Sequence, residues 1–243
     1  MRSLVASLKS NNLNCSSPTA SLLLLMMMVL TLLTSTYAFI TPLTTLHDRC
    51  SSSSLQQSAA AKTAGSTANK IAWNLIDKVE EAGQIGSKAP ETIQADIAAL
   101  ANELSDRQCE SSTRIPTDVT LTGVHNLLYS MSPGGSSGAI GPVFVGKVTQ
   151  EFLDDVKFIN VVQFGPLKIE LHAVREVVDN TRIRVTFQET VVKILDLEVT
   201  RKETKGAGVW KQLYVGEVCR DGDRRLLRVM ETPSLFVIQQ SLS

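Results

Sequence analysis

The sequence predicts an α+β fold that is mainly β, with two N-terminal helices in residues 69–106 and an antiparallel barrel of about eight strands in residues 119–240. Three observations support this prediction. Apolar residues recur at helical spacing before residue 106, and the apolar period changes to two after Val119. Turn-forming residues then separate many short apolar segments. Short strands joined by tight turns avoid exposed edges when they close into a barrel.

The helical region divides at Gly83 into two amphipathic segments. The first has apolar residues at three- and four-residue spacing: Ile71, Leu75, Val79 and Ala82. Gly83 is a suitable stop, and Pro90 followed by Glu91 is a suitable first turn for the second segment. The second segment carries one apolar stripe: Ile93, Ile97, Leu100 and Leu104. We expect both helices to pack on the core rather than to cross a membrane.

Alternation of polar and apolar residues is clearest in 168–173 and 182–188. Further strands are expected at 124–129, 145–152, 157–163, 190–199, 209–215, 225–230 and 235–239. The expected breaks between strands are 132–135, 165–166, 179–180, 206–208, 221–223 and 232–233. We interpret the Gly-rich segment 134–138 as a flexible loop or lid at the barrel mouth, because no helix follows it to form a phosphate-binding site.

The N-terminal region has the features of a leader with two parts. Residues 1–38 have basic residues ahead of an apolar block that is shorter than the ~20 residues of a membrane-spanning helix, and Ala38 and Phe39 flank the expected signal cleavage. Residues 39–68 are rich in Ser, Thr, Ala and Gln, as in a transit peptide or linker. This order resembles the bipartite leader of algal plastid proteins, so we expect a plastid location. The alternative is a secreted or signal-anchored protein with a disordered stalk.

Residues 69–243 are enough for one domain with a core. Of the 24 basic and 24 acidic residues in the chain, the leader holds four and one, which leaves 20 and 23. No basic stripe indicates nucleic-acid binding, and no polybasic patch indicates headgroup binding. Cys109 and Cys219 lack the spacing of a zinc site, and a bond between them is not required. We therefore expect no metal, no cofactor and no nucleic-acid partner.

Several segments, in this order, resemble the plastid lipid-associated proteins, also called fibrillins. They follow the two helices and are 121–130 (LTGVHNLLYS), 146–150 (GKVTQ), 159–162 (INVV), 210–214 (WKQLY), 227–229 (LRV) and 235–238 (LFVI). His125 stands where the family has a tryptophan, and Gly216 stands at a position where it has an aspartate. An insert at 219–222 lengthens one turn, and 230–232 (MET) replaces an Arg-Gly turn. The resemblance covers nearly all of residues 69–243.

The resemblance implies a lipocalin-like barrel and association with lipids, carotenoids or quinones in the plastid stroma, at thylakoids or on plastoglobules. A hydrophobic lipid or isoprenoid ligand and a peripheral contact with a plastid membrane or plastoglobule surface are the expected partners. An apolar interior can bind such a ligand at ~0.8 kcal/mol per buried methylene, or it can be filled as a solid core. The alternative functions are a scaffolding or assembly factor for photosynthetic complexes and, last, an enzyme acting on a small hydrophobic substrate.

Four residues are candidates for contact with a ligand: His125, Trp210, Tyr214 and Arg228. His125 lies in the first strand and is either an inward contact for a polar head or a packed or exposed strand histidine. Trp210 and Tyr214 are four residues apart, so strict alternation places them on one face as a ligand wall or membrane rim. Arg228 matches a family Leu-Arg position, where we expect a structural ion pair or a contact with a carboxylate or phosphate headgroup.

No catalytic residue is predicted, because the sequence contains no nucleophile motif and residues 69–243 hold only two histidines, His125 and His172. We expect His172 to face solvent beside Glu170. The chain is therefore predicted not to be an enzyme.

Overall fold

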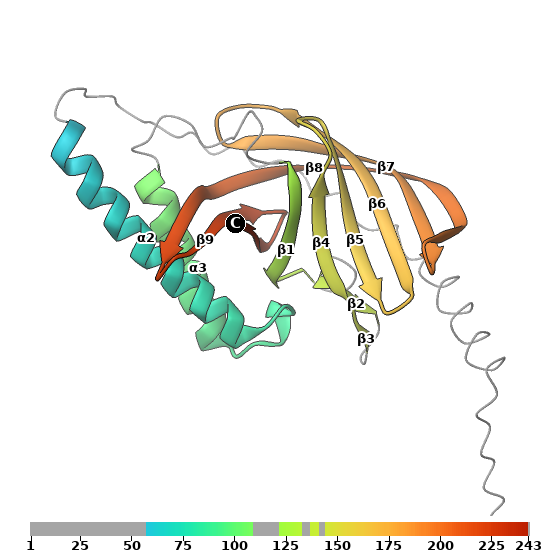
Figure 1. Cartoon of the computed structure of the whole chain (residues 1–243), viewed down its shortest axis with the longest axis horizontal. Helices are drawn as coiled ribbons and strands as arrows, with labels where there is room; N and C mark the ends of the chain where they lie inside the picture. The colour runs from blue at the N-terminus through green and yellow to red at the C-terminus, as the bar shows by residue number, and fades with distance from the viewer. Residues whose placement is uncertain (1–56, 109–121, 133–136, 141–143, 243) are drawn as a thin grey trace, which may run out of the picture. The chain divides into compact units, whose positions relative to one another are not determined.

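The computed structural model describes residues 57–108, 122–132, 137–140 and 144–242 (Figure 1). These residues belong to one compact unit, Arg49–Ser243. Several sequence predictions lie outside the described residues. They are the signal peptide, its cleavage between Ala38 and Phe39, the transit segment up to residue 56, Cys109 and most of the expected lid.

The helix α2 (Gln57–Ala82) ends where the sequence predicts. Gly83 has a φ of 77°, and its N–H donates to the Val79 carbonyl at 2.9 Å, which is the left-handed cap that glycine favours. The start of α2 differs from the prediction, because the helix begins before residue 69, inside the segment interpreted as a transit peptide. That segment is Ala-rich, and alanine has the highest intrinsic helix propensity.

A short 3-10 helix, η1 (Gly86–Lys88), leads to α3 (Glu91–Gln108). The helix α3 begins directly after Pro90, has Glu91 in its first turn and has Arg107 in its last turn. Both charges complement the helix dipole. Among the described residues, no helix has the length and apolarity to cross a membrane.

In the part of the chain that the structure describes, eight antiparallel strands close into a barrel in the order β1-β10-β9-β8-β7-β6-β5-β4. Their bounds are β1 (Gly123–Ser130), β4 (Lys147–Phe152), β5 (Lys157–Phe164), β6 (Leu167–Val177), β7 (Arg182–Ile194), β8 (Leu197–Arg220), β9 (Asp223–Glu231) and β10 (Leu235–Leu242). The ring closes because β1 pairs with both β10 and β4. A separate two-stranded sheet consists of β2 (Ala139–Ile140) and β3 (Phe144–Val145). The predicted fold class is confirmed.

The hairpin of β7 and β8 departs from the prediction. The expected strand 190–199 and the expected break at 206–208 are both wrong, because the turn lies at Leu195–Asp196 and β8 continues through the glycines. Both turn residues have positive φ, 52° and 61°, which a Leu-Asp pair does not indicate in a sequence. Gly206 pairs with Phe187, and a Cβ there would lie 3.2 Å from that ring. Gly206 therefore allows the close approach of an aromatic side chain and does not form a turn.

Two bulges change the faces to which side chains point. The pairing register shifts between Gln212 and Tyr214 in β8, and between Leu127 and Tyr129 in β1. A bulge inserts one extra residue into its strand. Because the side-chain period of a strand is two, each insertion moves the following residues to the opposite face.

The main hydrophobic core lies between the helices and the outer face of β1, β8, β9 and β10. Its helical members are Ile71, Ala72, Trp73, Leu75, Ile76, Val79, Ile97, Ala101 and Leu104. Its strand members are Tyr129, Leu213, Tyr214, Val218, Leu227, Val229 and Val237. Figure 1 shows α2 and α3 running together beside β9. The prediction that both helices pack on the core is confirmed.

Candidate functional site

The inner face of the barrel carries a buried polar group opposite the helix-covered core. Along β9, Leu227 and Val229 pack against the helices, whereas Arg228 and Met230 lie on the inner face. Only 1% of the Arg228 surface is exposed. Side chains alternate between the two faces of a strand, so the inward direction of Arg228 follows from its apolar neighbours.

Arg228 has few partners for a buried charge. Its Nη2 donates to Gln212 Oε1 at 3.4 Å and to Met230 Sδ at 3.5 Å, and its guanidinium lies 4.8 Å from the centroid of the Phe152 ring. Its Nε and Nη1 have no hydrogen-bond partner among the described residues. The ion pair expected for Arg228 is wrong for the described part of the chain, because the side chain points inward, away from the acidic residues of the surface.

A second guanidinium, that of Arg175, lies near the same ring, 5.7 Å from the Phe152 centroid. Its Nε donates to the Asp155 carbonyl at 2.6 Å, and its Nη2 lies 3.8 Å from the Asp155 carboxylate. Burial lowers the pKa of Arg175, and the acidic neighbours Asp155 and Asp154 oppose this shift. Burial lowers the pKa of Arg228 to about 9, with a further contribution from the charge of Arg175. Among the described residues, only Arg175 of the two has an acidic partner.

His125 of β1 and Gln150 of β4 extend the polar group along the inner face of the barrel. They pair directly between β1 and β4, and both are at most 1% exposed. The His125 ring packs edge-on against Phe152, with 5.3 Å between centroids. Gln150 Nε2 donates to Asn160 Oδ1 at 2.7 Å, while Gln150 Oε1 has no hydrogen-bond partner among the described residues. The structure therefore shows a buried, packed His125 and excludes the exposed alternative, and the contact with a ligand's polar head stays a prediction.

An aromatic wall borders this polar group. The rings of Phe152 and Phe158 stack with 5.3 Å between centroids, and Phe158 lies 5.7 Å from Trp210. Ala173 and Ile183 pack in the same cluster, so the wall is apolar beyond its aromatic rings. We call the set of Arg228, Gln212, Gln150, His125 and the aromatic wall the inner cluster.

Tyr214 does not belong to the inner cluster. It pairs with Val229 and packs beneath the helices, where burial raises its pKa. The prediction that Trp210 and Tyr214 share one face is wrong, because the bulge between Gln212 and Tyr214 reverses the alternation. The structure therefore brings three candidates together around Phe152, namely His125, Trp210 and Arg228, and it separates Tyr214 from them.

Three members or neighbours of the inner cluster were missed in the sequence: Gln150, Arg175 and Gln212. Each lies two residues from an inward-pointing neighbour, respectively Phe152, Ala173 and Trp210. The alternation is present in the sequence, but polar residues in strands usually face solvent, so the pattern alone does not single out these three as inward-pointing.

A second charged group lies on the outer face of β6 and β7. Glu170 accepts from Lys193 Nζ at 2.8 Å and lies 3.3 Å from His172 Nε2 and 3.4 Å from Lys168 Nζ. His172 is therefore bonded to Glu170 and half-buried rather than fully solvent-facing. In the described ranges, no three His, Cys, Asp or Glu side chains are placed to hold a metal ion.

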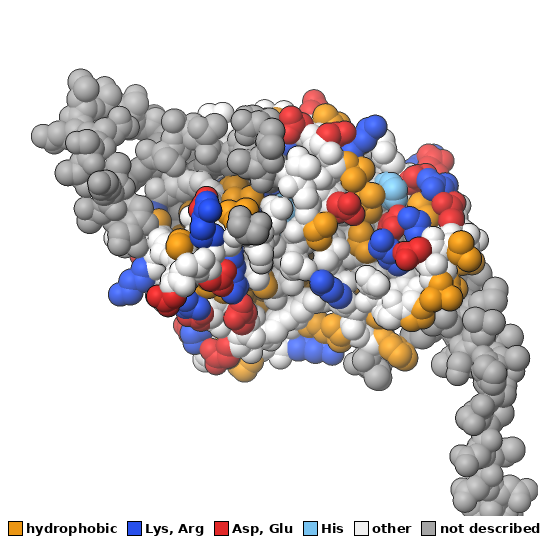
Figure 2. All heavy atoms as spheres, in the orientation of Figure 1, with side chains coloured by type: hydrophobic (Ala, Val, Ile, Leu, Met, Phe, Trp, Pro, Cys, Tyr) orange, Lys and Arg blue, Asp and Glu red, His pale blue; other side chains and the backbone are white. Residues whose placement is uncertain are grey.

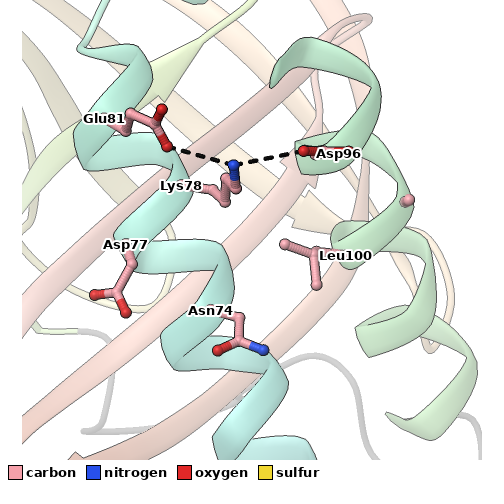
Figure 3. Close-up of a pocket in the computed structure, with 7 residues that line it drawn as sticks. Asn74, Asp77, Lys78, Glu81, Asp96 and Leu100 are labelled. Atoms are coloured by element: carbon pink, nitrogen blue, oxygen red, sulfur yellow. Dashed lines mark ion pairs between the residues drawn. The ribbon is translucent and has the colours of Figure 1, made fainter. Parts of the chain in front are cut away.

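An open groove of about 470 Å³ runs between α2 and α3 (Figure 3). Its lining residues are Asn74, Asp77, Lys78, Glu81, Asp96, Ala99 and Leu100. Lys78 bridges the two helices, because its Nζ lies 3.4 Å from Glu81 and 3.5 Å from Asp96. Charged side chains surround the groove, but most of its surface is apolar.

Apolar side chains are exposed at one end of the barrel. Leu195 and Leu197 in the β7–β8 turn are each 74% exposed, and Phe144 and Val145 of β3 are about half exposed. The Leu195 N–H donates to the Pro166 carbonyl at 2.9 Å, which ties this turn to the turn between β5 and β6. Figure 2 shows exposed hydrophobic side chains, with basic ones beside them, along the edge of the molecule where β3 lies. We call Phe144, Val145, Leu195 and Leu197 the apolar rim.

Comparison with known proteins gives one family. The PAP_fibrillin family model matches residues 69–232, which extend from α2 to the residue after β9 and include every member of the inner cluster. No curated protein and no solved structure matches the chain.

Proposed function

The chain belongs to the PAP_fibrillin family of plastid lipid-associated proteins, and from this premise we propose that its barrel binds a hydrophobic lipid, carotenoid or quinone at plastoglobules or thylakoids. The family is a structural one and is not known for enzymes. In this proposal the polar end of the ligand contacts His125 and Arg228, and the ring of Trp210 contacts its apolar part.

The observation that carries the proposal is the set of buried polar atoms without partners in the inner cluster. Arg228 Nε and Nη1, Gln212 Nε2 and Gln150 Oε1 are all buried and have no hydrogen-bond partner among the described residues. A buried polar atom without a partner costs roughly 1–3 kcal/mol, so a fold selected for stability alone does not accumulate such atoms. A ligand head that bonds to these atoms, with its apolar part against the aromatic wall, accounts for both features.

The apolar rim supports a peripheral contact with a plastid membrane or plastoglobule surface. Leu195 and Leu197 project from a tight turn and are not covered by other described residues. Transfer of such side chains into a lipid surface is favourable by roughly 25 cal/mol per Å² of apolar area. The N-terminal leader, with cleavage between Ala38 and Phe39, would bring the protein to the plastid.

The direct experiment is mass spectrometry of small molecules that co-purify with the tagged full chain from isolated plastids. One carotenoid, quinone or acyl lipid in stoichiometric amount supports a ligand inside the barrel. A mixed, substoichiometric set of lipids indicates surface association only, and a lipid-free protein contradicts the proposal. The double variant Leu195→Ser/Leu197→Ser is the matched control, because it should weaken sedimentation with vesicles and leave a barrel ligand in place.

The groove between α2 and α3 favours one alternative, a scaffolding factor for photosynthetic complexes. Its apolar floor with charged residues around it, among them Lys78, is the arrangement found at contacts between proteins. Crosslinking in plastids tests it: a defined protein partner at α2 or α3, lost in Lys78→Glu, would support scaffolding, and recovery of lipid alone would not.

An enzyme is the last alternative, and unchanged pigment and quinone profiles in His125→Ala plastids would remove its one candidate residue.

A further inference from the structure

The unpaired charge of Arg228 narrows the class of ligand. This inference rests on the proposed function, because it concerns the same barrel site. We infer that the barrel ligand is a lipid with a free carboxylate, such as a fatty acid or an isoprenoid acid, and that this carboxylate binds the guanidinium of Arg228. A hydrocarbon carotenoid, a neutral quinone and an esterified acyl lipid are then poorer ligands than the free acid.

The buried atoms without partners are mainly donors. On Arg228, Gln212 and Gln150 of the inner cluster, three such atoms are N–H donors (Arg228 Nε, Arg228 Nη1 and Gln212 Nε2) and one is the acceptor Gln150 Oε1. A carboxylate has two oxygens and only accepts hydrogen bonds, so one carboxylate can satisfy two or three of these donors. A hydrocarbon offers them nothing, and a quinone carbonyl offers one weaker acceptor.

The charges of the inner cluster also favour a single negative charge. Arg175 has the Asp155 carboxylate at 3.8 Å, whereas Arg228 has no acidic partner among the described residues. One uncompensated guanidinium therefore remains near Phe152, and a carboxylate supplies one compensating charge. A phosphate monoester would bring nearly two negative charges at neutral pH and exceed what Arg228 alone requires.

The surroundings of Arg228 are suited to the apolar start of an acyl or prenyl chain. Its guanidinium lies over the face of Phe152 at 4.8 Å, a cation–π contact that fixes the plane of its N–H groups. The apolar rings of Phe158 and Trp210 continue from Phe152 along the barrel wall. Methylenes next to a carboxylate would therefore contact apolar rings, while the headgroup contacts donors.

The test compares two probes with the same chain, cis-parinaric acid and its methyl ester, by fluorescence titration of the delipidated full chain. We expect the acid to bind at least about 10-fold more tightly than the ester, as for other charge-assisted pairs. Equal binding of acid and ester would overturn the carboxylate inference and leave the proposed function standing. Absence of binding by both probes would overturn both.

Substitutions then show whether the preference for the acid over the ester depends on Arg228. Arg228→Gln should reduce the preference for the acid to less than about 3-fold and change ester binding little. Arg184→Gln, which removes an exposed guanidinium paired with Glu176, is the matched control and should keep the wild-type preference. If Arg228→Gln does not fold, Arg228→Lys keeps the charge, and the acid–ester comparison on the wild type still decides the inference. A preference that persists unchanged in Arg228→Gln would contradict Arg228 as the binding group.

Discussion

The two faces of β9 differ in what they contribute. On the outer face, Leu227 and Val229 are fully buried in the hydrophobic core that α2 and α3 cover. On the inner face, Arg228 is equally buried but carries a charge without an acidic partner among the described residues. The same strand thus has one face suited to stability and one that is costly to maintain.

This difference indicates where function lies. A core optimised for stability satisfies its polar atoms or excludes them, and departures from that rule concentrate at functional sites. Among the described residues, the helix-covered core leaves one buried polar side-chain atom without a hydrogen-bond partner, Trp73 Nε1, whereas the inner face leaves four, on Arg228, Gln212 and Gln150. Substitutions on the two faces should therefore change stability in opposite directions.

The largest effect is expected on the outer face. Leu227→Ala leaves a cavity in the core between β9 and the helices, and it should lower the free energy of unfolding by about 2–5 kcal/mol. Urea denaturation of the lipid-free protein measures this. Leu195→Ala, at a position 74% exposed, is the control and should change stability by less than about 0.5 kcal/mol. Similar losses for the two variants would mean that the helix-covered core is not the main source of stability.

A substitution on the inner face should raise the free energy of unfolding instead of lowering it. Arg228→Met replaces a buried, unpaired guanidinium by an apolar side chain of similar length, and it should raise the free energy of unfolding of the lipid-free protein by about 1–4 kcal/mol. The same variant should gain no stability from added cis-parinaric acid. Paired urea and ligand titrations check both parts. A loss of stability like that of Leu227→Ala would instead show that Arg228 stabilises the fold.

A third prediction concerns the contact between η1 and the outer face. A Cβ on Gly86 would lie 2.4 Å from the buried ring of Tyr129, so Gly86→Ala forces the ring or η1 to move. We expect a loss of about 1–3 kcal/mol in the free energy of unfolding, measured by thermal or urea denaturation. A Cβ at Gly222 would have no atom within 4 Å, so the only unfavourable feature of Gly222→Ala is the φ of 86°. This variant therefore separates the effect of backbone strain from that of overpacking.

The smallest effect is expected at Glu170, away from both faces of β9. Burial acts to raise its pKa, but the bonds from Lys193 and His172 outweigh burial and hold the pKa below its usual value of 4.5. A carboxylate with a depressed pKa stabilises the folded state above the unfolded pKa, and this contribution disappears as pH falls through the lower folded pKa. Glu170→Gln should cost about 1 kcal/mol at pH 7 and less at pH 3, as urea midpoints at both pH values would show. An equal cost at both pH values would contradict a role for its charge.

The fold was largely predictable because its signals are local. Helical spacing up to Leu104, the stop at Gly83, the helix start at Pro90–Glu91, and the change of period after Val119 all appear in the sequence. The turn at Leu195–Asp196 was not predictable, since neither residue is a usual choice for positive φ.

The site was only partly predictable because it depends on strand register. His125 and Arg228 were identified from their strands, but the bulge after Gln212 placed Tyr214 on the opposite face from Trp210. Whether an arginine meets an acid also depends on side chains brought by other strands, which one sequence does not reveal. A bulge of this kind shifts the register by one residue and has no strong sequence signal of its own.

The most direct test of the central claim is a crystal structure of the full chain with a brominated fatty acid, located by the anomalous signal of bromine. We expect one ligand inside the barrel, with its carboxylate about 3 Å from Arg228 and its chain against Phe158 and Trp210. A ligand bound only at the apolar rim or in the groove between α2 and α3, with the barrel interior unchanged, would contradict it.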